Sequence, residues 1–210
     1  MKLILTSAGL TNKSIVKAFQ ELAGENPRIA FIPTASNIEK GDKDWLIANY
    51  AECDSVGELD IVDISALPKE EWLPRLQMAQ VIFVGGGNTG YLLDWMRKSG
   101  LDKELPELLK TRLYVGISAG SVALSKRIWA DSEWLYGDEL QKAPAGLGYI
   151  DFNFRPHLNS KYFTQARIEN IEPVAKRLEG PLYACDDDTA LVVDEEKITV
   201  VSEGTWRKFE

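Results

Sequence analysis

Short, almost entirely apolar runs alternate along the chain with longer stretches whose apolar residues recur every three or four positions. Apolar runs without alternating polar residues are typical of strands buried on both faces. Apolar residues at every third or fourth position are typical of amphipathic helices. We predict strands at residues 2–5, 28–33, 59–64, 81–84, 113–117 and 182–185. We predict helices at residues 14–23, 45–53, 70–78 and 164–178, and another after residue 90. This order predicts an α/β fold with a mainly parallel sheet and helices on both faces.

A short helix and a C-terminal hairpin complete the predicted fold. A helix starts at Ala119 and extends to about residue 126, and residues 197–201 and 205–209 predict a closing antiparallel hairpin. The sequence contains no internal repeat and no linker-like segment, so residues 1–210 are expected to form a single domain. Folds of this class bind ligands beyond the carboxyl ends of the parallel strands.

Composition and charge exclude several kinds of partner. No apolar run approaches the roughly 20 residues of a membrane span, and residues 1–7 are too short an apolar stretch for a signal peptide. The net charge of −8, with no basic stripe, argues against nucleic acid and anionic membrane surfaces. Cys53 and Cys185 are isolated, which favours a reduced cytoplasmic protein in which both pack in the core. Homodimerisation through an exposed helix or sheet edge stays open.

Residues 113–124 hold the best candidate for a nucleophile. An apolar run leads into Gly116-Ile-Ser-Ala-Gly120, a G-x-S-x-G spacing that predicts a strand, a sharp turn and the start of a helix. A Cβ at either glycine would collide with the strand or the helix. The turn would place the Ser118 hydroxyl at a helix N-terminus, where free N–H groups favour negative charge. The alternative is an ordinary turn in which Ser118 only caps the helix.

A second glycine-rich loop, Gly85-Gly-Gly-Asn-Thr-Gly90, follows the predicted strand at residues 81–84. It matches the G-x-G-x-x-G pattern of dinucleotide-binding folds. However, it is not in the first βα unit, and the acidic residues about 20 positions on do not end a following strand. If its strand lies beside the one that ends at Ser118, the N–H groups of Gly87 and Ala119 would converge as an oxyanion hole. A glycine turn without a ligand is the other alternative.

His157 is the only histidine, so an imidazole that activates a serine must be this one. It follows Pro156, which restricts the backbone, in a loop after an apolar strand. Three aspartates at residues 186–188 end another strand. Such a run is usually a solvated turn, but one carboxylate there would be able to orient His157. No metal or other cofactor is expected, because the chain has no second histidine and no thiolate pair.

These residues run along the chain in the order serine, histidine, aspartate, whereas α/β-hydrolases have the order serine, acid, histidine. The quoted motifs are Gly85-Gly-Gly-Asn-Thr89, Gly116-Ile-Ser-Ala-Gly120, Arg155-Pro-His157 and Asp186-Asp-Asp-Thr-Ala-Leu191. In this order and spacing they resemble peptidase family S51, the dipeptidase E (aspartyl dipeptidase) group, with cyanophycinase as a more distant relative. The resemblance covers nearly the whole chain. It implies a flavodoxin-like, class I glutamine amidotransferase-like fold in which serine replaces that relative's nucleophilic cysteine.

The resemblance also implies roles for individual residues. Ser118 would be the nucleophile and His157 the base, with Gly87 and Ala119 as the oxyanion donors. The third triad member of the family is acidic and precedes a late strand, which matches Asp187. Some members have glutamate at that position, so the shorter side chain of Asp187 requires its loop to lie closer to His157. Asp188 is the next best match to the position. An acidic residue after the elbow, near Glu133, is another candidate and ranks below Asp187.

The substrate implied by the resemblance is a short peptide. An N-terminal aspartate would need a cation for its side chain, and Arg155 and Arg167 are the nearest candidates by position. Asn88, in the first motif, is a further candidate for substrate binding, through its uncharged amide. The negative net charge repels acidic substrates, and residues 158–167 form a shorter segment than in aspartyl-specific members. Both strict aspartyl specificity and a broader preference therefore stay open.

Three functions remain open on this reading of the sequence. The first is a serine exopeptidase of the dipeptidase E type that forms an acyl-enzyme on Ser118. The second is another acyl hydrolase on the same scaffold, namely an esterase, amidase or isopeptidase. The third is a non-catalytic binding protein that retains the pocket.

Overall fold

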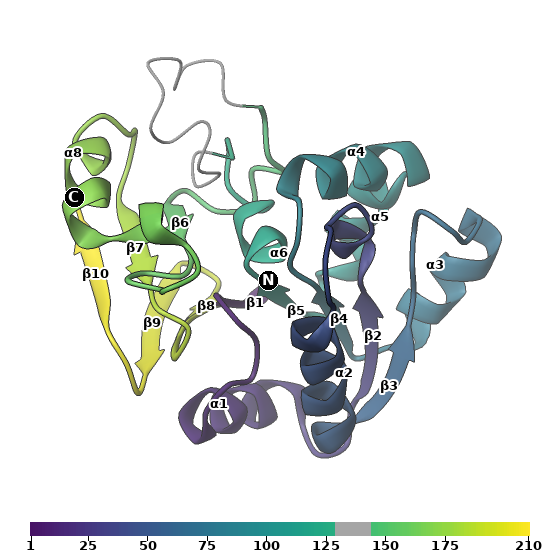
Figure 1. The fold of residues 1–210 in the computed structure, drawn as a ribbon. Coiled ribbons are helices and arrows are strands. Elements are labelled where there is room, and N and C mark those ends of the chain that lie inside the picture. The colour runs from purple at the N-terminus through teal and green to yellow at the C-terminus, as the bar shows by residue number, and fades with distance from the viewer. Residues whose placement is uncertain (129–143) are drawn as a thin grey trace.

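A seven-stranded sheet dominates the computed structural model, which describes residues 1–128 and 144–210 (Figure 1). Its strands are β1 Lys2–Thr6, β2 Arg28–Ile32, β3 Glu58–Ile61, β4 Val81–Val84, β5 Leu113–Ile117, β8 Thr189–Asp194 and β9 Lys197–Ser202. They lie in the order β3-β2-β4-β5-β1-β8-β9. The first five strands of this order are mutually parallel, and β8 and β9 add an antiparallel edge. The predicted, mainly parallel sheet is confirmed.

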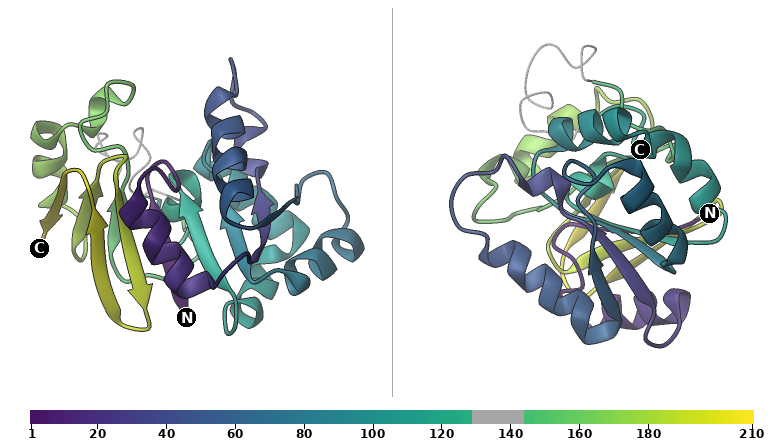
Figure 2. Two further views of the ribbon diagram at one scale, coloured as in Figure 1. Left: turned by 90° about the horizontal axis from the view of Figure 1, so that it is seen from below. Right: turned by 90° about the vertical axis from the view of Figure 1, so that its right-hand side faces the viewer.

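Helices cover both faces of this sheet (Figure 2). On one face lie α1 Lys13–Ala23 and α2 Asp44–Val56, which bury Ile15, Phe19 and Cys53 against the strands. On the other lie α3 Lys69–Met78, α4 Thr89–Ser99 and α5 Leu101–Leu108, the first of which buries Trp72 completely. Central strands such as β4 and β5 are buried at every position, which explains their unalternated apolar sequences.

A smaller sheet stands beside the main one at the side of β9 (Figure 1). It consists of β6 Asn153–Arg155, β7 Leu182–Cys185 and β10 Trp206–Phe209, in the order β10-β7-β6. Phe154 and Tyr183 of this sheet belong to the same buried cluster as Leu3 and Leu5 of β1. The two sheets therefore share one core, and the carboxyl ends of β6 and β7 face the same region as that of β5.

The predicted C-terminal hairpin is wrong, because its two strands join different sheets. β9 pairs with β8 in the main sheet, whereas β10 pairs with β7 in the smaller one. Asp186 explains the divergence. Its N–H donates to the Thr205 carbonyl at 3.1 Å, and its carboxylate accepts the Thr205 N–H. This reciprocal contact draws the chain away from β9 toward β7.

The helix after Ser118 is shorter than predicted. α6 spans Ala119–Val122 only. The carbonyls of Ala123, Leu124 and Ser125 accept hydrogen bonds from N–H groups of residues 147–150. Because a distant segment takes these acceptors, regular α-helical bonding ends there.

The helix predicted at residues 164–178 is divided into two. A 3-10 turn, η3 Thr164–Ala166, is followed by α8 Ile168–Ala175, and Arg167 between them is extended. The Ala166 carbonyl accepts the Asn159 N–H at 2.7 Å, and the Asn159 side chain accepts the Ile168 N–H at 3.4 Å. These contacts interrupt the helix, and α8 begins after them.

The helices of residues 1–128 and 144–210 are all too short or too polar to span a membrane.

Candidate active site

Ser118 forms the sharp turn between β5 and α6. Its φ of 46° lies in a region that residues other than glycine rarely occupy. Its N–H donates to the Thr6 carbonyl of β1 at 2.9 Å, and its carbonyl accepts the N–H groups of Ser121 and Val122. The side chain makes no capping bond to α6. The hydroxyl is therefore available to another partner, unlike that of an ordinary cap.

The glycines on either side of Ser118 are required by close backbone packing. A Cβ at Gly116 would lie 2.6 Å from the Ser121 nitrogen, and one at Gly120 would lie 2.2 Å from the Val84 carbonyl oxygen of β4. Both distances are far below van der Waals contact, and both neighbours are backbone atoms that cannot rotate away. The collision predicted at Gly116, with the helix of the turn, is thus present in the fold, whereas Gly120 meets the neighbouring strand β4 and not the strand that leads into the turn.

We predict that Gly120→Ala lowers the free energy of unfolding by at least about 2 kcal/mol, since overpacking against backbone forces the elbow to move. Gly90→Ala is the matched control. Its Cβ would lie 3.5 Å from the Asn88 side chain, an ordinary contact at the start of α4. Alanine there should be neutral or stabilise by up to about 1 kcal/mol. Urea unfolding of both variants measures the difference, and equal stabilities would contradict the packing argument.

His157 lies between Ser118 and Asp187. Its Nε2 is 3.0 Å from the Ser118 Oγ, and its Nδ1 is 2.6 Å from the Asp187 Oδ1. A carboxylate only accepts hydrogen bonds, so we assign the ring proton to Nδ1. This tautomer leaves the Nε2 lone pair facing the serine hydroxyl. The arrangement is able to accept a proton from Ser118 and to stabilise the resulting imidazolium.

The three consecutive aspartates have different positions. The Asp186 carboxylate accepts hydrogen bonds from the Thr189 hydroxyl at 2.7 Å and from the Asp188 N–H at 3.1 Å, which closes the turn. Asp187 faces His157. Asp188 contributes its carbonyl, which accepts the Asn12 side-chain amide at 2.9 Å. Of the acidic candidates, Asp187 is the one that the fold brings to the histidine, and Glu133 lies outside the described residues.

The glycine-rich loop after β4 lies next to Ser118, because β4 and β5 are neighbours and pair in parallel. A Cβ at Gly86 would lie 3.5 Å from the Ser118 Cβ, and one at Gly87 would lie 2.2 Å from the Ala35 carbonyl oxygen. Close packing thus accounts for Gly87 without a dinucleotide, whereas the contact at Gly86 is an ordinary one. Within residues 1–128 and 144–210, the N–H groups of Gly87 and Ala119 donate no hydrogen bond to the protein.

The residues considered for substrate binding have dissimilar surroundings. Arg155 is only 5% exposed at the end of β6, two residues before His157. Arg167 lies on the surface just before α8. Asn88 caps α4, with its side-chain oxygen accepting the Tyr91 N–H at 2.9 Å. The Asn88 oxygen is therefore committed to the fold.

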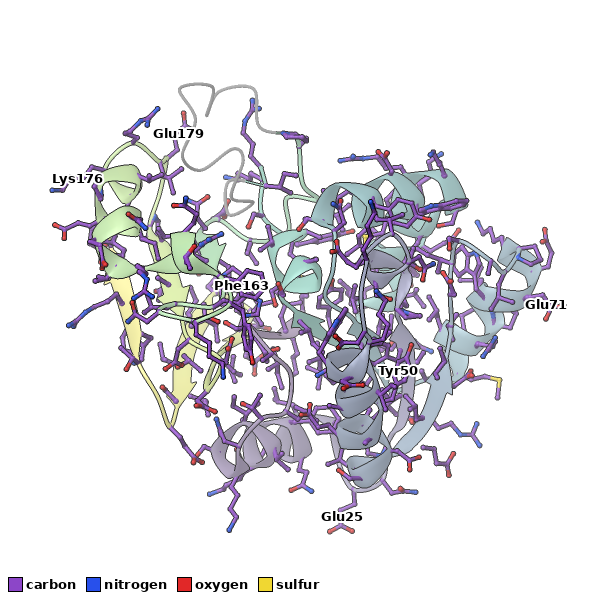
Figure 3. The ribbon with its side chains drawn as sticks, viewed as in Figure 1. Glu25, Tyr50, Glu71, Phe163, Lys176 and Glu179 are labelled. Atoms are coloured by element: carbon purple, nitrogen blue, oxygen red, sulfur yellow. The ribbon has the colours of Figure 1, made fainter. Side chains whose placement is uncertain are left out.

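Two residues near the histidine were not predicted. The ring of Phe163 stacks on the imidazole of His157, with centroids 4.1 Å apart and planes inclined by 9°. Phe163 is 49% exposed and lies between the smaller sheet and α6 (Figure 3). Ser7, in the loop after β1, accepts the His157 N–H at 3.1 Å. The small polar loop is visible in the sequence, but its partners are more than a hundred residues away.

Among the residues that the structure describes, the other metal-binding and nucleophilic side chains form no second centre. The described residues contain no group of three histidine, cysteine or acidic side chains that could hold a metal ion. Both cysteines are buried, and burial raises the pKa of the Cys53 and Cys185 thiols well above the usual range. Thiols in such surroundings are poor nucleophiles, which fits the predicted packing role.

Relatives of this chain are peptidases. It is 33% identical over 162 residues to an uncharacterized peptidase of Listeria monocytogenes, covering 73% of this chain and 77% of the relative. It is 29% identical over 186 residues to an uncharacterized peptidase of Pasteurella multocida, covering 85% and 87%. It is also 28% identical over 143 residues to a Drosophila melanogaster protein described as a probable alpha-aspartyl dipeptidase, covering 64% and 58%.

Solved structures agree with this relationship. A crystal structure described as that of a peptidase E protein from Listeria monocytogenes superposes with a TM-score of 0.78 at 25% identity, covering 97% of this chain and 98% of the other. A peptidase from an acI-B1 Actinobacterium has the same fold, with a TM-score of 0.75 at 21% identity and coverage of 98% and 88%. The profile of peptidase family S51 matches residues 3–201. The chain therefore belongs to peptidase family S51, a family of serine peptidases.

Proposed function

We propose that this protein is a serine exopeptidase of the dipeptidase E type, with Ser118, His157 and Asp187 as its catalytic triad. The observation that carries the proposal is the continuous series of contacts from the Ser118 hydroxyl through His157 to the Asp187 carboxylate. A base within hydrogen-bond reach of a serine, itself oriented by a third group, is the arrangement that activates a serine nucleophile. The turn at Ser118 and the neighbouring glycine-rich loop supply the N–H groups of Ala119 and Gly87, which would act as oxyanion donors.

The proposed reaction is acyl transfer to water. His157 Nε2 removes the Ser118 proton as Oγ attacks the scissile carbonyl carbon. The N–H groups of Gly87 and Ala119 stabilise the oxyanion that forms. The imidazolium, paired with Asp187, then protonates the leaving amine, and the acyl-enzyme remains. His157 next removes a proton from water, whose oxygen attacks the carbonyl carbon of the ester. The imidazolium then gives this proton to the Ser118 Oγ as the ester bond breaks, which releases the acid product and restores the serine.

A short peptide is the proposed substrate class. The description of the Drosophila relative as a probable alpha-aspartyl dipeptidase supports the proposal that the substrates are peptides with an N-terminal aspartate. Arg155 is the better placed cation for that side chain, because it precedes His157 by two residues on the same strand and loop. A guanidinium binds a carboxylate through two parallel hydrogen bonds. We also propose that residues 1–210 act as one peptidase domain, since the triad draws on both sheets and their shared core.

Two assays test the proposal together. A fluorophosphonate probe should label the wild-type protein at Ser118, and a panel of Asp-X, Glu-X, Ala-X and Met-X dipeptides should reveal cleavage. Cleavage confined to Asp-X supports aspartyl specificity, and cleavage across the panel supports a broader exopeptidase. Labelling of Ser118 without cleavage of any peptide would favour an esterase, amidase or isopeptidase. Absence of both would overturn the proposed activity.

A further inference from the structure

The hydroxyl of Ser7 joins two segments of the chain. Ser7 follows β1 and is completely buried. Its hydroxyl donates to the Cys185 carbonyl at 2.9 Å and accepts the His157 N–H at 3.1 Å. A buried hydroxyl with both a donor and an acceptor partner fixes the positions of both.

The position of Ser7 matters because the proposed triad is divided between the two sheets. Ser118 follows β5 of the main sheet, whereas His157 and Asp187 follow β6 and β7 of the smaller one. The distance from Nε2 to Oγ therefore depends on how the two sheets are held together. β1 pairs in parallel with β5, and Thr6 is in register with Ile117. Ser7 is thus level with Ser118, at the boundary between the two sheets.

The same loop also holds the strand end that carries the aspartate. The Thr11 hydroxyl donates to the Asp187 carbonyl at 2.8 Å. The Cys185 carbonyl, which accepts the Ser7 hydroxyl, also accepts the Leu158 N–H at 2.9 Å. The loop after β1 thereby contacts the backbone of His157 and the backbone of Cys185 and Asp187.

We propose that Ser7 and Thr11 are positioning residues, which set the His157 imidazole at the distance and angle needed to reach the Ser118 hydroxyl. This inference rests on the proposed function. Ser7 acts through the backbone of His157 and does not touch the reacting atoms. Without its hydroxyl, the His157 N–H loses its partner and the left-handed backbone at this residue, with φ of 62°, loses a restraint. A misplacement of about 1 Å in such a site costs roughly 100-fold in rate.

Steady-state kinetics of Ser7→Ala on the best substrate of the dipeptide panel test the inference. We expect kcat to fall by about 10- to 100-fold, as for other supporting partners of site residues, while KM changes less than about threefold. Asn153→Ala is the matched control. Asn153 is also buried, at the far end of β6, where its side chain donates to the Glu179 carbonyl. It should lose similar stability but keep its kcat, and an equal loss of kcat in both variants would overturn the inference.

A double-mutant cycle separates positioning from a general loss of structure. In the His157→Ala background, Ser7→Ala should cause no further loss in the residual hydrolysis of an activated ester, because the group it positions is absent. A further loss as large as in the wild type would overturn the inference. If Ser7→Ala does not fold, Thr11→Val serves in its place, because Thr11 is exposed and its loss removes the contact to Asp187. It should lower kcat about threefold or more, and an unchanged kcat would contradict the role of the loop.

Failure of this inference differs from failure of the proposed function. A wild-type protein that reacts with the fluorophosphonate probe, together with a Ser7→Ala variant of unchanged kcat, would reject the positioning role alone. A wild-type protein that neither reacts with the probe nor cleaves a dipeptide would reject both.

Discussion

Replacing Ser118 by alanine is expected to lower kcat for dipeptide hydrolysis by about 10⁴- to 10⁶-fold. The variant lacks the oxygen that forms the acyl-enzyme, so only the oxyanion donors and substrate binding remain. The free energy of unfolding should change by less than about 1 kcal/mol, because the Ser118 side chain makes no capping bond and its backbone contacts are unchanged. Initial rates on the best substrate of the dipeptide panel measure the loss.

The control for this experiment is Ser55→Ala. Ser55 is exposed near the end of α2, and its hydroxyl donates to the Glu52 carbonyl within the same helix. It should retain wild-type kcat and react normally with a fluorophosphonate probe, whereas Ser118→Ala should not react at all. Full activity in Ser118→Ala would exclude it as the nucleophile.

Asp187→Asn is expected to lower kcat by about 10³- to 10⁴-fold, the second largest effect. Asparagine has nearly the same shape but brings an N–H donor toward Nδ1 of His157. An amide donor there favours the tautomer with its proton on Nε2, which cannot accept the Ser118 proton. The loss should appear in kcat, because the carboxylate acts on the histidine and not on the substrate.

Asp188→Asn is a closely matched control for Asp187→Asn. It removes the same charge from the adjacent position, but Asp188 contacts the rest of the fold through its backbone carbonyl. We expect its kcat to stay within about threefold of the wild type, because Asp188 is exposed and the carboxylate that contacts His157, that of Asp187, is retained. Equal losses in the two variants would assign the effect to net charge and would remove Asp187 from the proposed triad.

The sequence contains the local geometry of the nucleophile turn almost completely. Gly116 is required by a collision with Ser121 five residues along the chain, a local steric limit, although Gly120 is required by Val84 of the neighbouring strand β4. The parallel arrangement of β1, β2, β4 and β5 also follows from their apolar runs, because strands covered on both faces have this composition, whereas β3 at the edge of the sheet is only partly buried. These features were predictable because short-range sterics and burial decide them.

Long-range backbone contacts decide the features that were predicted wrongly. β10 leaves β9 because of Asp186 and Thr205, and the helix at residues 164–178 is interrupted where Asn159 bonds to Ala166. A sequence pattern records which segments are apolar, but not which carbonyl a distant N–H will reach. Register and pairing partners across loops therefore lie beyond it.

For the candidate site, the sequence alone determined the residue types: one serine at an elbow, one histidine and a run of three aspartates. The resemblance favoured Asp187, but only the tertiary structure shows why this aspartate faces the histidine: the Asp186 carboxylate closes the turn, and the Asp187 Oδ1 lies 2.6 Å from Nδ1. The structure alone also placed Ser7 between the two sheets. The chemical properties of each side chain follow from its residue type and can therefore be predicted from the sequence. The distances of about 3 Å between the side chains of the site depend on contacts between residues more than a hundred positions apart in the sequence, such as that of Ser7 with His157.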